Sequence, residues 1–119
     1  MPLLPLALRF KGGETVRAHG LIDSGATVSV MPYGLGIRLG AVWEAQTTVV
    51  KLTGNLADQE ARALLAEGNI GNLTPVRLVF AWARSDNVPL FLGQVNFFEE
   101  FNVSLRRAQR VFEIERATK

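Results

Sequence analysis

The sequence contains no cysteine, and this absence excludes disulfide bonds, thiolate metal sites and cysteine nucleophiles together. It contains a single histidine, His19. A serine–histidine–aspartate triad would have to use that residue, and the Gly-x-Ser-x-Gly motif that often carries the serine is absent. The sequence around His19 does not offer the carboxylate ligands that a metal site would need. We therefore expect no metal and no cofactor, and we interpret His19 as a structural residue, partly buried or at a sheet edge.

Long hydrophobic runs and a strong charge excess are also missing. No apolar run approaches the length of a membrane span, and Pro2 and Pro5 interrupt the short apolar N-terminal segment, which lacks the features of a signal peptide. The formal net charge is only +2, and the one dense basic cluster consists of Arg106, Arg107 and Arg110. Nucleic-acid binding usually needs a larger basic face with aromatic residues. We expect a soluble, cytoplasmic protein that binds neither membranes nor nucleic acid.

The length and composition are those of one globular domain. A chain of 119 residues can bury one hydrophobic core but not two, so we expect a single domain over residues 1–119. Hydrophobic residues make up 48% of the chain and charged residues 20%, which excludes disorder, collagen-like repeats and a coiled coil.

The hydrophobic pattern predicts a chain built mostly of strands. Apolar and polar residues alternate with the period of two that half-buried strands show, most clearly over residues 76–83. A turn or one helical turn is expected over 33–40, and one or two helical turns over 96–101. The predicted strands are 6–10, 14–22, 28–31, 42–52, 76–83 and 90–93, followed by a hairpin of 103–105 and 111–114.

The most informative stretch is residues 21–32, with the sequence LIDSGATVSVMP. Two apolar residues precede Asp23, Ser24 and Gly25, and an alternation of apolar and polar residues follows. An acid between two strand-like runs, with a glycine two residues later, is expected on a tight loop rather than in a strand. On its own, this tripeptide is most typical of a turn, because Asp and Ser hydrogen-bond the backbone and Gly supplies positive φ.

A second informative stretch covers residues 89–103, with the sequence PLFLGQVNFFEEFNV. A short apolar run ends at Gly93, and an apolar segment with two acids follows. On its own, this stretch is typical of a packing unit of strand, turn and helix.

Together, the two stretches resemble the retropepsin-like (retroviral-type) aspartic proteases. In that family the active-site loop reads two apolar residues, Asp, Ser or Thr, Gly and Ala. A later element with two hydrophobic residues and Gly commonly has the form Leu-Gly-Arg before a short helix, whereas this chain has Gln94 in place of the Arg. The resemblance spans essentially the whole chain and is nearest to small stand-alone bacterial members. It implies an all-β, single-lobe closed β-barrel with a flap hairpin and one short C-terminal helix.

The resemblance also implies roles for the active-site loop. Asp23 would be the catalytic residue, and Ser24 would hydrogen-bond across a dimer interface to hold two loops together. The Gly25 backbone would approach the carboxylates, and Ala26 would line the bottom of the cleft.

Two further segments are assigned by the same resemblance. The strand with Leu92 and Gly93 would pass beneath the catalytic loop, where a side chain would clash. The best candidates for the tip of the flap are Thr53, Gly54 and Asn55, although an ordinary hairpin turn explains them equally well.

Residues 56–67 present a conflict between local and long-range information. The segment is rich in Ala, Leu and Glu, and Gly68 could close it as a helix. The resemblance instead implies a strand in which Ala61, Ala63 and Leu65 alternate with their neighbours. We predict the strand, because tertiary context often overrides helix propensity.

The expected function is that of a homodimeric aspartic endopeptidase acting on peptides or unfolded proteins. Hydrolysis without a metal or a Ser or Cys nucleophile requires an activated water, which two carboxylates sharing one proton can provide. Asp58 and Asp86 lack the context of Asp23, so a symmetric dimer is the simplest source of the second carboxylate. One alternative is a dimer of the same fold that binds peptides or a partner without cleaving. A weaker alternative is a basic β-domain that contacts nucleic acid through the arginine cluster.

Overall fold

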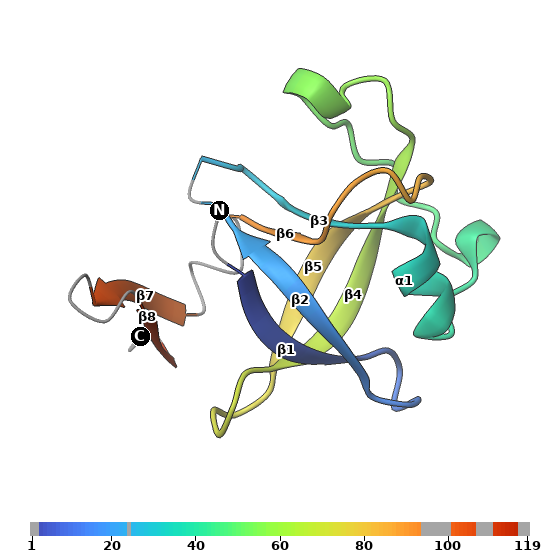
Figure 1. Ribbon diagram of the computed structural model, residues 1–119. Coiled ribbons are helices and arrows are strands. Elements are labelled where there is room, and N and C mark those ends of the chain that lie inside the picture. The colour runs from blue at the N-terminus through green and yellow to red at the C-terminus, as the bar shows by residue number, and fades with distance from the viewer. Residues whose placement is uncertain (1–2, 24, 94–100, 107–110, 117–119) are drawn as a thin grey trace.

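The structure is a computed structural model that describes residues 3–23, 25–93, 101–106 and 111–116, with only the backbone described in the last two ranges. Strands dominate it (Figure 1), so the predicted all-β class is confirmed. The strands are β1 (Leu3–Arg9), β2 (Val16–Ile22), β3 (Ser29–Met31), β4 (Ala61–Asn69), β5 (Val76–Ala83), β6 (Phe91–Leu92), β7 (Phe101–Arg106) and β8 (Val111–Arg116). The helical segments are α1 (Tyr33–Arg38) and the 3₁₀ turns η1 (Trp43–Ala45) and η2 (Gly54–Leu56).

The strands β1 to β6 close into a barrel in the order β1-β2-β6-β3-β5-β4, because β1 pairs with both β2 and β4. Most neighbours are antiparallel, but β6 runs parallel to β2 and β3 runs parallel to β5. The short strand β6 therefore lies between β2 and β3, which the 23–28 loop connects. The predicted C-terminal hairpin is confirmed, since β7 and β8 pair antiparallel from Phe101↔Arg116 to Arg106↔Val111.

The main core fills the barrel. Alternate residues of the strands point inward, and the largest of the fully buried side chains are Trp82, Phe80, Leu8, Met31, Leu64, Leu78 and Leu92. The aromatic rings of Tyr33, Trp43 and Trp82 contact one another, with centroids 5.2–5.9 Å apart. Such aromatic pairs add stability beyond the area they bury. This cluster fixes α1 and η1 against β5.

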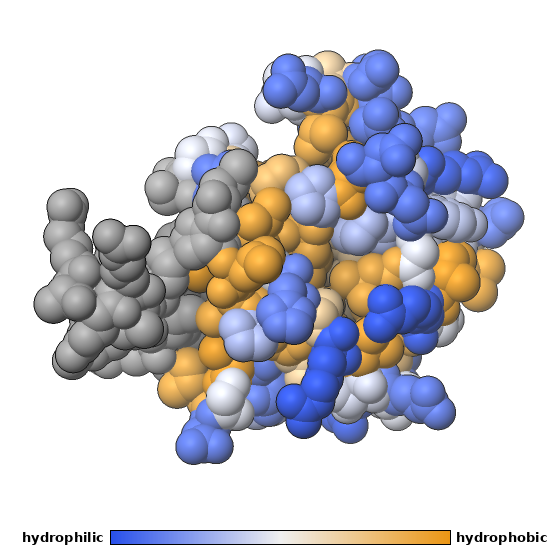
Figure 2. Space-filling view, viewed as in Figure 1, coloured by the Kyte–Doolittle hydropathy of each residue, from blue (hydrophilic) through white to orange (hydrophobic). Residues whose placement is uncertain are grey.

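A second apolar cluster lies outside the barrel wall, where residues 50–56 pack on it. Figure 1 shows the segment between η1 and β4 projecting from the barrel, and Figure 2 shows apolar side chains where this projection meets the barrel. Leu52 is buried there against the outward faces of β3, β4 and β5. The buried members of the cluster are Val30, Leu52, Ala61, Ala81, Ala83 and Val88.

The strand predicted over residues 42–52 is wrong. The structure has the turn η1 at Trp43–Ala45, and the rest of the segment makes only an isolated bridge between Val49 and Arg62. Trp43 is 2% exposed because its ring packs edge-on to Trp82, and this packing turns the chain away from an extended path. The helical turn expected over 33–40 is present as α1.

The strand predicted within residues 56–67 is confirmed as β4, which begins at Ala61. The residues that point into the barrel are Leu64, Ala66 and Gly68, however, and Leu65 is exposed. Ala61 is buried on the other face, beneath residues 50–56.

Two smaller predictions have different outcomes. His19 is exposed within β2, opposite Pro5, so of the two expected settings the partly buried one is wrong. β2 pairs with β6 only at Leu21 and Ile22, so this pairing does not reach His19 and its position is consistent with the expected sheet edge. Of the helix predicted over 96–101, residues 96–100 lie outside the described residues, and Phe101 begins β7.

Candidate active site

Asp23 lies on a tight loop directly after β2, as predicted. Its backbone N–H donates to the Leu92 carbonyl oxygen at 3.1 Å, and its carbonyl oxygen accepts from the Ala26 N–H at 3.1 Å, which closes a turn. Its carboxylate Oδ1 accepts a hydrogen bond from the Gly25 N–H at 2.9 Å. Hydrogen bonds on both sides of the residue therefore fix the half-buried Asp23. Ser24 lies outside the described residues.

The second motif passes beneath this loop, as the sequence predicts. Residues Phe91 and Leu92 form β6, and Gly93 follows against the loop backbone. A Cβ atom on Gly93 would lie 2.5 Å from the Val28 carbonyl oxygen and 2.9 Å from that of Ala26. Any side chain at this position would clash with backbone atoms, so glycine is required here by close approach rather than by positive φ.

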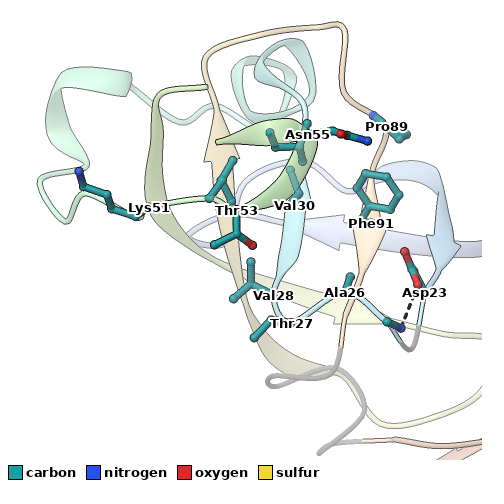
Figure 3. A pocket seen from close by; sticks show the side chains of 13 residues that line it. Asp23, Ala26, Thr27, Val28, Val30, Lys51, Thr53, Asn55, Pro89 and Phe91 are labelled. Carbon is teal, nitrogen blue, oxygen red and sulfur yellow. Dashed lines mark hydrogen bonds between the residues drawn. The ribbon is translucent and has the colours of Figure 1, made fainter. Parts of the chain in front are cut away.

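A pocket of about 430 Å³ opens beside Asp23. Three segments line it, namely residues 23–30, 51–56 and 89–91, each in part. Figure 3 shows the Asp23 carboxylate next to Ala26 and beneath the Phe91 ring, with Lys51 on the far side and directed away from the pocket. Most of the described lining is apolar, and the charged residues in it are Asp23 and Lys51.

The residues predicted to form a flap come from a hairpin over residues 48–63. Its arms are joined by the Val50 N–H to the Ala61 carbonyl oxygen at 3.0 Å and the Ala63 N–H to the Thr48 carbonyl oxygen at 2.8 Å. Thr53 and Asn55 line the pocket, whereas Gly54 does not. Gly54 begins η2 with φ +63°, a conformation that favours glycine.

The structure thus brings Asp23, Gly25, Ala26, Thr53 and Asn55 to one pocket. It places Leu92 elsewhere, fully buried in the barrel core. Sequence reasoning did not assign the apolar lining from the other segments, above all Leu52, Leu56 and Phe91. Leu52 and Leu56 flank the flap candidates Thr53, Gly54 and Asn55, and Phe91 belongs to the second stretch, residues 89–103.

Sequence reasoning also missed Ser29. Among the residues whose burial the structure describes, it is the one buried polar side chain, at 2% exposure. Its Oγ accepts a hydrogen bond from the Gly93 N–H at 3.1 Å. The sequence signal that could have identified Ser29 is its position between Val28 and Val30. Successive side chains of a strand point to opposite faces, so Ser29 points away from the pocket that the two valines line.

Within the described part of the chain, no three His, Asp or Glu side chains are grouped so that they could hold a metal ion. No helix in that part is long and apolar enough to cross a membrane. The described residues bring to this site the Asp23 carboxylate, the backbone N–H groups of its loop and the apolar pocket. No protein-family model matches this sequence, and no curated protein matches it.

Proposed function

We propose that the protein is a homodimeric aspartic endopeptidase with a retropepsin-like fold. The observation that carries the proposal is the placement of Asp23, on a hydrogen-bonded loop at the side of a mostly apolar pocket that the 48–63 hairpin also lines. The close approach of Gly93 to the same loop adds support, because it joins the two motifs that gave rise to the expectation.

The proposed chemistry needs a second carboxylate. Among the described residues that line the pocket, Asp23 is the one acid, so the second carboxylate would be Asp23 of another copy, meeting the first on a two-fold axis. In the proposed mechanism the two carboxylates share one proton, so that one can accept a proton from water while the other donates to the substrate.

In the first step, the ionised carboxylate takes a proton from a water molecule as the water oxygen attacks the peptide carbonyl carbon. The protonated carboxyl donates its proton to the carbonyl oxygen, which gives a tetrahedral diol. In the second step, the carboxyl that took the proton from water gives it to the peptide nitrogen, and the other carboxylate takes a proton from one hydroxyl of the diol. The carbon–nitrogen bond breaks, which leaves an amine and a carboxylic acid and returns the pair of carboxylates to its starting state. The Gly25 N–H bond to Asp23 Oδ1 holds the carboxylate in place throughout.

The proposed substrate is an extended or unfolded polypeptide. A pocket of about 430 Å³ per protomer is large enough for side chains of a peptide but not for a folded domain. Val28, Val30 and Phe91 present apolar surface in it, which favours apolar side chains near the cleaved bond. The cytoplasm remains the proposed location, because a chain without cysteine fits a reducing compartment.

The test is cleavage of denatured casein, with and without pepstatin, from about pH 4 to about pH 7, since general acid–base catalysis depends on pH. Cleavage should be inhibited by pepstatin and should disappear in Asp23→Asn, which keeps the size of the side chain. General acid–base contributions predict a loss of at least about 10²–10⁴-fold.

Sedimentation of the same samples tests the dimer. Twice the chain mass of 13.1 kDa is 26.2 kDa. A protein that stays monomeric with substrate present, or a folded Asp23→Asn variant that cleaves at the parent rate, would contradict the proposal. Binding of casein without cleavage would identify the alternative, a peptide-binding dimer without catalytic activity.

A further inference from the structure

Ser29 is an unusual residue for its position. It lies at the start of β3 at 2% exposure, while the next residues of the strand, Val30 and Met31, are apolar. A buried hydroxyl costs free energy unless it is hydrogen-bonded, and an alanine or valine would fill such a site without that cost. The hydrogen bond from the Gly93 N–H to Ser29 Oγ therefore calls for an explanation beyond packing.

That hydrogen bond connects Ser29 to Asp23 through two consecutive residues. The Gly93 N–H donates to Ser29 Oγ at 3.1 Å, and the carbonyl oxygen of the preceding Leu92 accepts from the Asp23 N–H at 3.1 Å. The backbone at the end of β6 is thus hydrogen-bonded both to Asp23 and to Ser29, which follows the Asp23 loop. Between these two bonds, Gly93 lies against the carbonyl groups of the loop.

β6 forms only a short ladder, although Leu92 is fully buried in the core and the Leu90 carbonyl oxygen accepts from the Leu21 N–H at 2.7 Å. It consists of two residues, pairs with β2 at Leu21 and Ile22, and pairs with β3 at the single position Val30. A strand this short gains few ladder hydrogen bonds. The core holds the Leu92 side chain, and the bond to Ser29 adds a hydrogen bond at the backbone of Gly93, directly after the strand.

We infer that Ser29 is a positioning residue for Asp23. Its hydroxyl holds the Gly93 N–H, which sets the position of the Leu92 carbonyl and, through it, the backbone of Asp23. This inference rests on the proposed function for its catalytic consequence, but the structural coupling can be measured without it. The geometry required of two carboxylates that share a proton makes small displacements costly, since a shift of about 1 Å can lower a rate about 10²-fold.

The experiment compares Ser29→Ala with Val76→Ala in the full-length protein. Ser29→Ala removes only the oxygen and leaves the Gly93 N–H without its acceptor. Val76→Ala is the matched control for lost core stability, because Val76 is 6% exposed and lies at the opposite end of β5 from the residues that pair with β3. Both variants are measured by amide hydrogen exchange and by casein cleavage at equal folded fraction.

Ser29→Ala should speed up exchange at the Gly93 and Asp23 amides. The increase should be about ten- to a hundredfold greater than the increase at core amides of β4. The turnover number kcat should fall about ten- to a hundredfold with little change in KM, because the pocket is untouched. Val76→Ala should show neither effect.

Two results would overturn the inference. One is an Asp23 amide that keeps its protection relative to β4 in Ser29→Ala. The other is an equal fall in kcat in both variants, which would reduce Ser29 to a contributor to stability. If the unaltered protein cleaves nothing, the proposed function fails, and the exchange measurement by itself decides whether Ser29 holds the Asp23 loop.

Discussion

The backbone of Gly93 lies against the carbonyl group of Val28, so closely that a Cβ atom on Gly93 would be 2.5 Å from the Val28 oxygen and 2.7 Å from its carbon. Both atoms belong to the backbone and cannot rotate away as a side chain could. The contact joins the end of β6 to the segment that follows Asp23, although the two are far apart in the sequence.

Gly93→Ala is therefore expected to displace the Asp23 loop. Overpacking of a well-packed site typically lowers the free energy of unfolding by about 1–3 kcal/mol. Because the backbone atoms here cannot move aside, we expect a loss at the upper end of that range. Chemical denaturation would measure the loss of stability, and casein cleavage the loss of activity. Gly20→Ala is the matched control, because the three atoms nearest to a Cβ there belong to the side chains of Leu92 and Leu90, with a closest contact of 2.8 Å. Equal losses in the two variants would show that the backbone contact has no special effect.

Asp86→Ala is expected to destabilise the start of α1. The carboxylate Oδ1 of Asp86 accepts a hydrogen bond from the Gly34 N–H at 2.6 Å, and Gly34 is in the first turn of α1. Loss of a side-chain acceptor at the start of a helix costs about 0.5–2 kcal/mol. Asp86→Asn retains an acceptor oxygen and should retain most of the stability in thermal unfolding. A full loss in Asp86→Asn would show that the negative charge, rather than the acceptor, is what matters.

Arg62→Met is expected to loosen the attachment of η1 to β4. The Arg62 guanidinium lies 4.6 Å from the centroid of the Trp43 ring and donates to the Trp43 carbonyl oxygen at 2.7 Å. Cation–π contacts and hydrogen bonds to charged groups stabilise proteins, so removing both at this half-buried site should lower the free energy of unfolding by about 1–2 kcal/mol. Denaturation followed by tryptophan fluorescence would measure it.

Arg84→Met provides the comparison for Arg62→Met. The Arg84 guanidinium is 5.3 Å from the Trp43 centroid, and Arg84 is exposed. The expected loss is smaller, because solvent weakens the contact. A larger loss for Arg84→Met than for Arg62→Met would contradict this ranking.

The ion pair between Arg9 and Glu67 is expected to contribute little. The nitrogen–oxygen distance is 3.1 Å, but both side chains are 44% exposed. Exposed pairs usually measure about 0.2–1 kcal/mol in double-mutant cycles and weaken as salt is added. A cycle with Arg9→Met and Glu67→Gln would measure the coupling energy. A value well above this range, or one that salt does not change, would mean that the pair is less solvated than its exposure indicates.

Phe91→Ala is expected to alter substrate use without unfolding the barrel. Phe91 is half-buried and lines the pocket next to Asp23, so its truncation removes apolar surface that a peptide side chain would contact. On the proposed function, kcat/KM for peptides with apolar side chains should fall about tenfold or more. Leu65→Ala, on the exposed face of β4, should leave kcat/KM unchanged. An unchanged kcat/KM in Phe91→Ala would exclude this pocket as the substrate site.

The sequence by itself determined most of the strands and both motifs of the site. Alternation with a period of two located β5, and the acid and glycine between apolar runs located the turn at Asp23. These features depend on local backbone geometry and on which face of a strand is apolar, so a short window of sequence contains them. The need for glycine at residue 93 was predicted from the resemblance and agrees with the contact that the structure has there.

Only the tertiary structure decided the remaining features, because each depends on residues distant in sequence. Residues 42–52 look like a strand, but the Trp43 ring packs on Trp82, and the chain turns there instead. The face of β4 that points inward follows from its pairing with β5. Ser29 acquires its buried partner 64 residues later in the chain, at Gly93. Such contacts form when the barrel closes, and no local pattern specifies them.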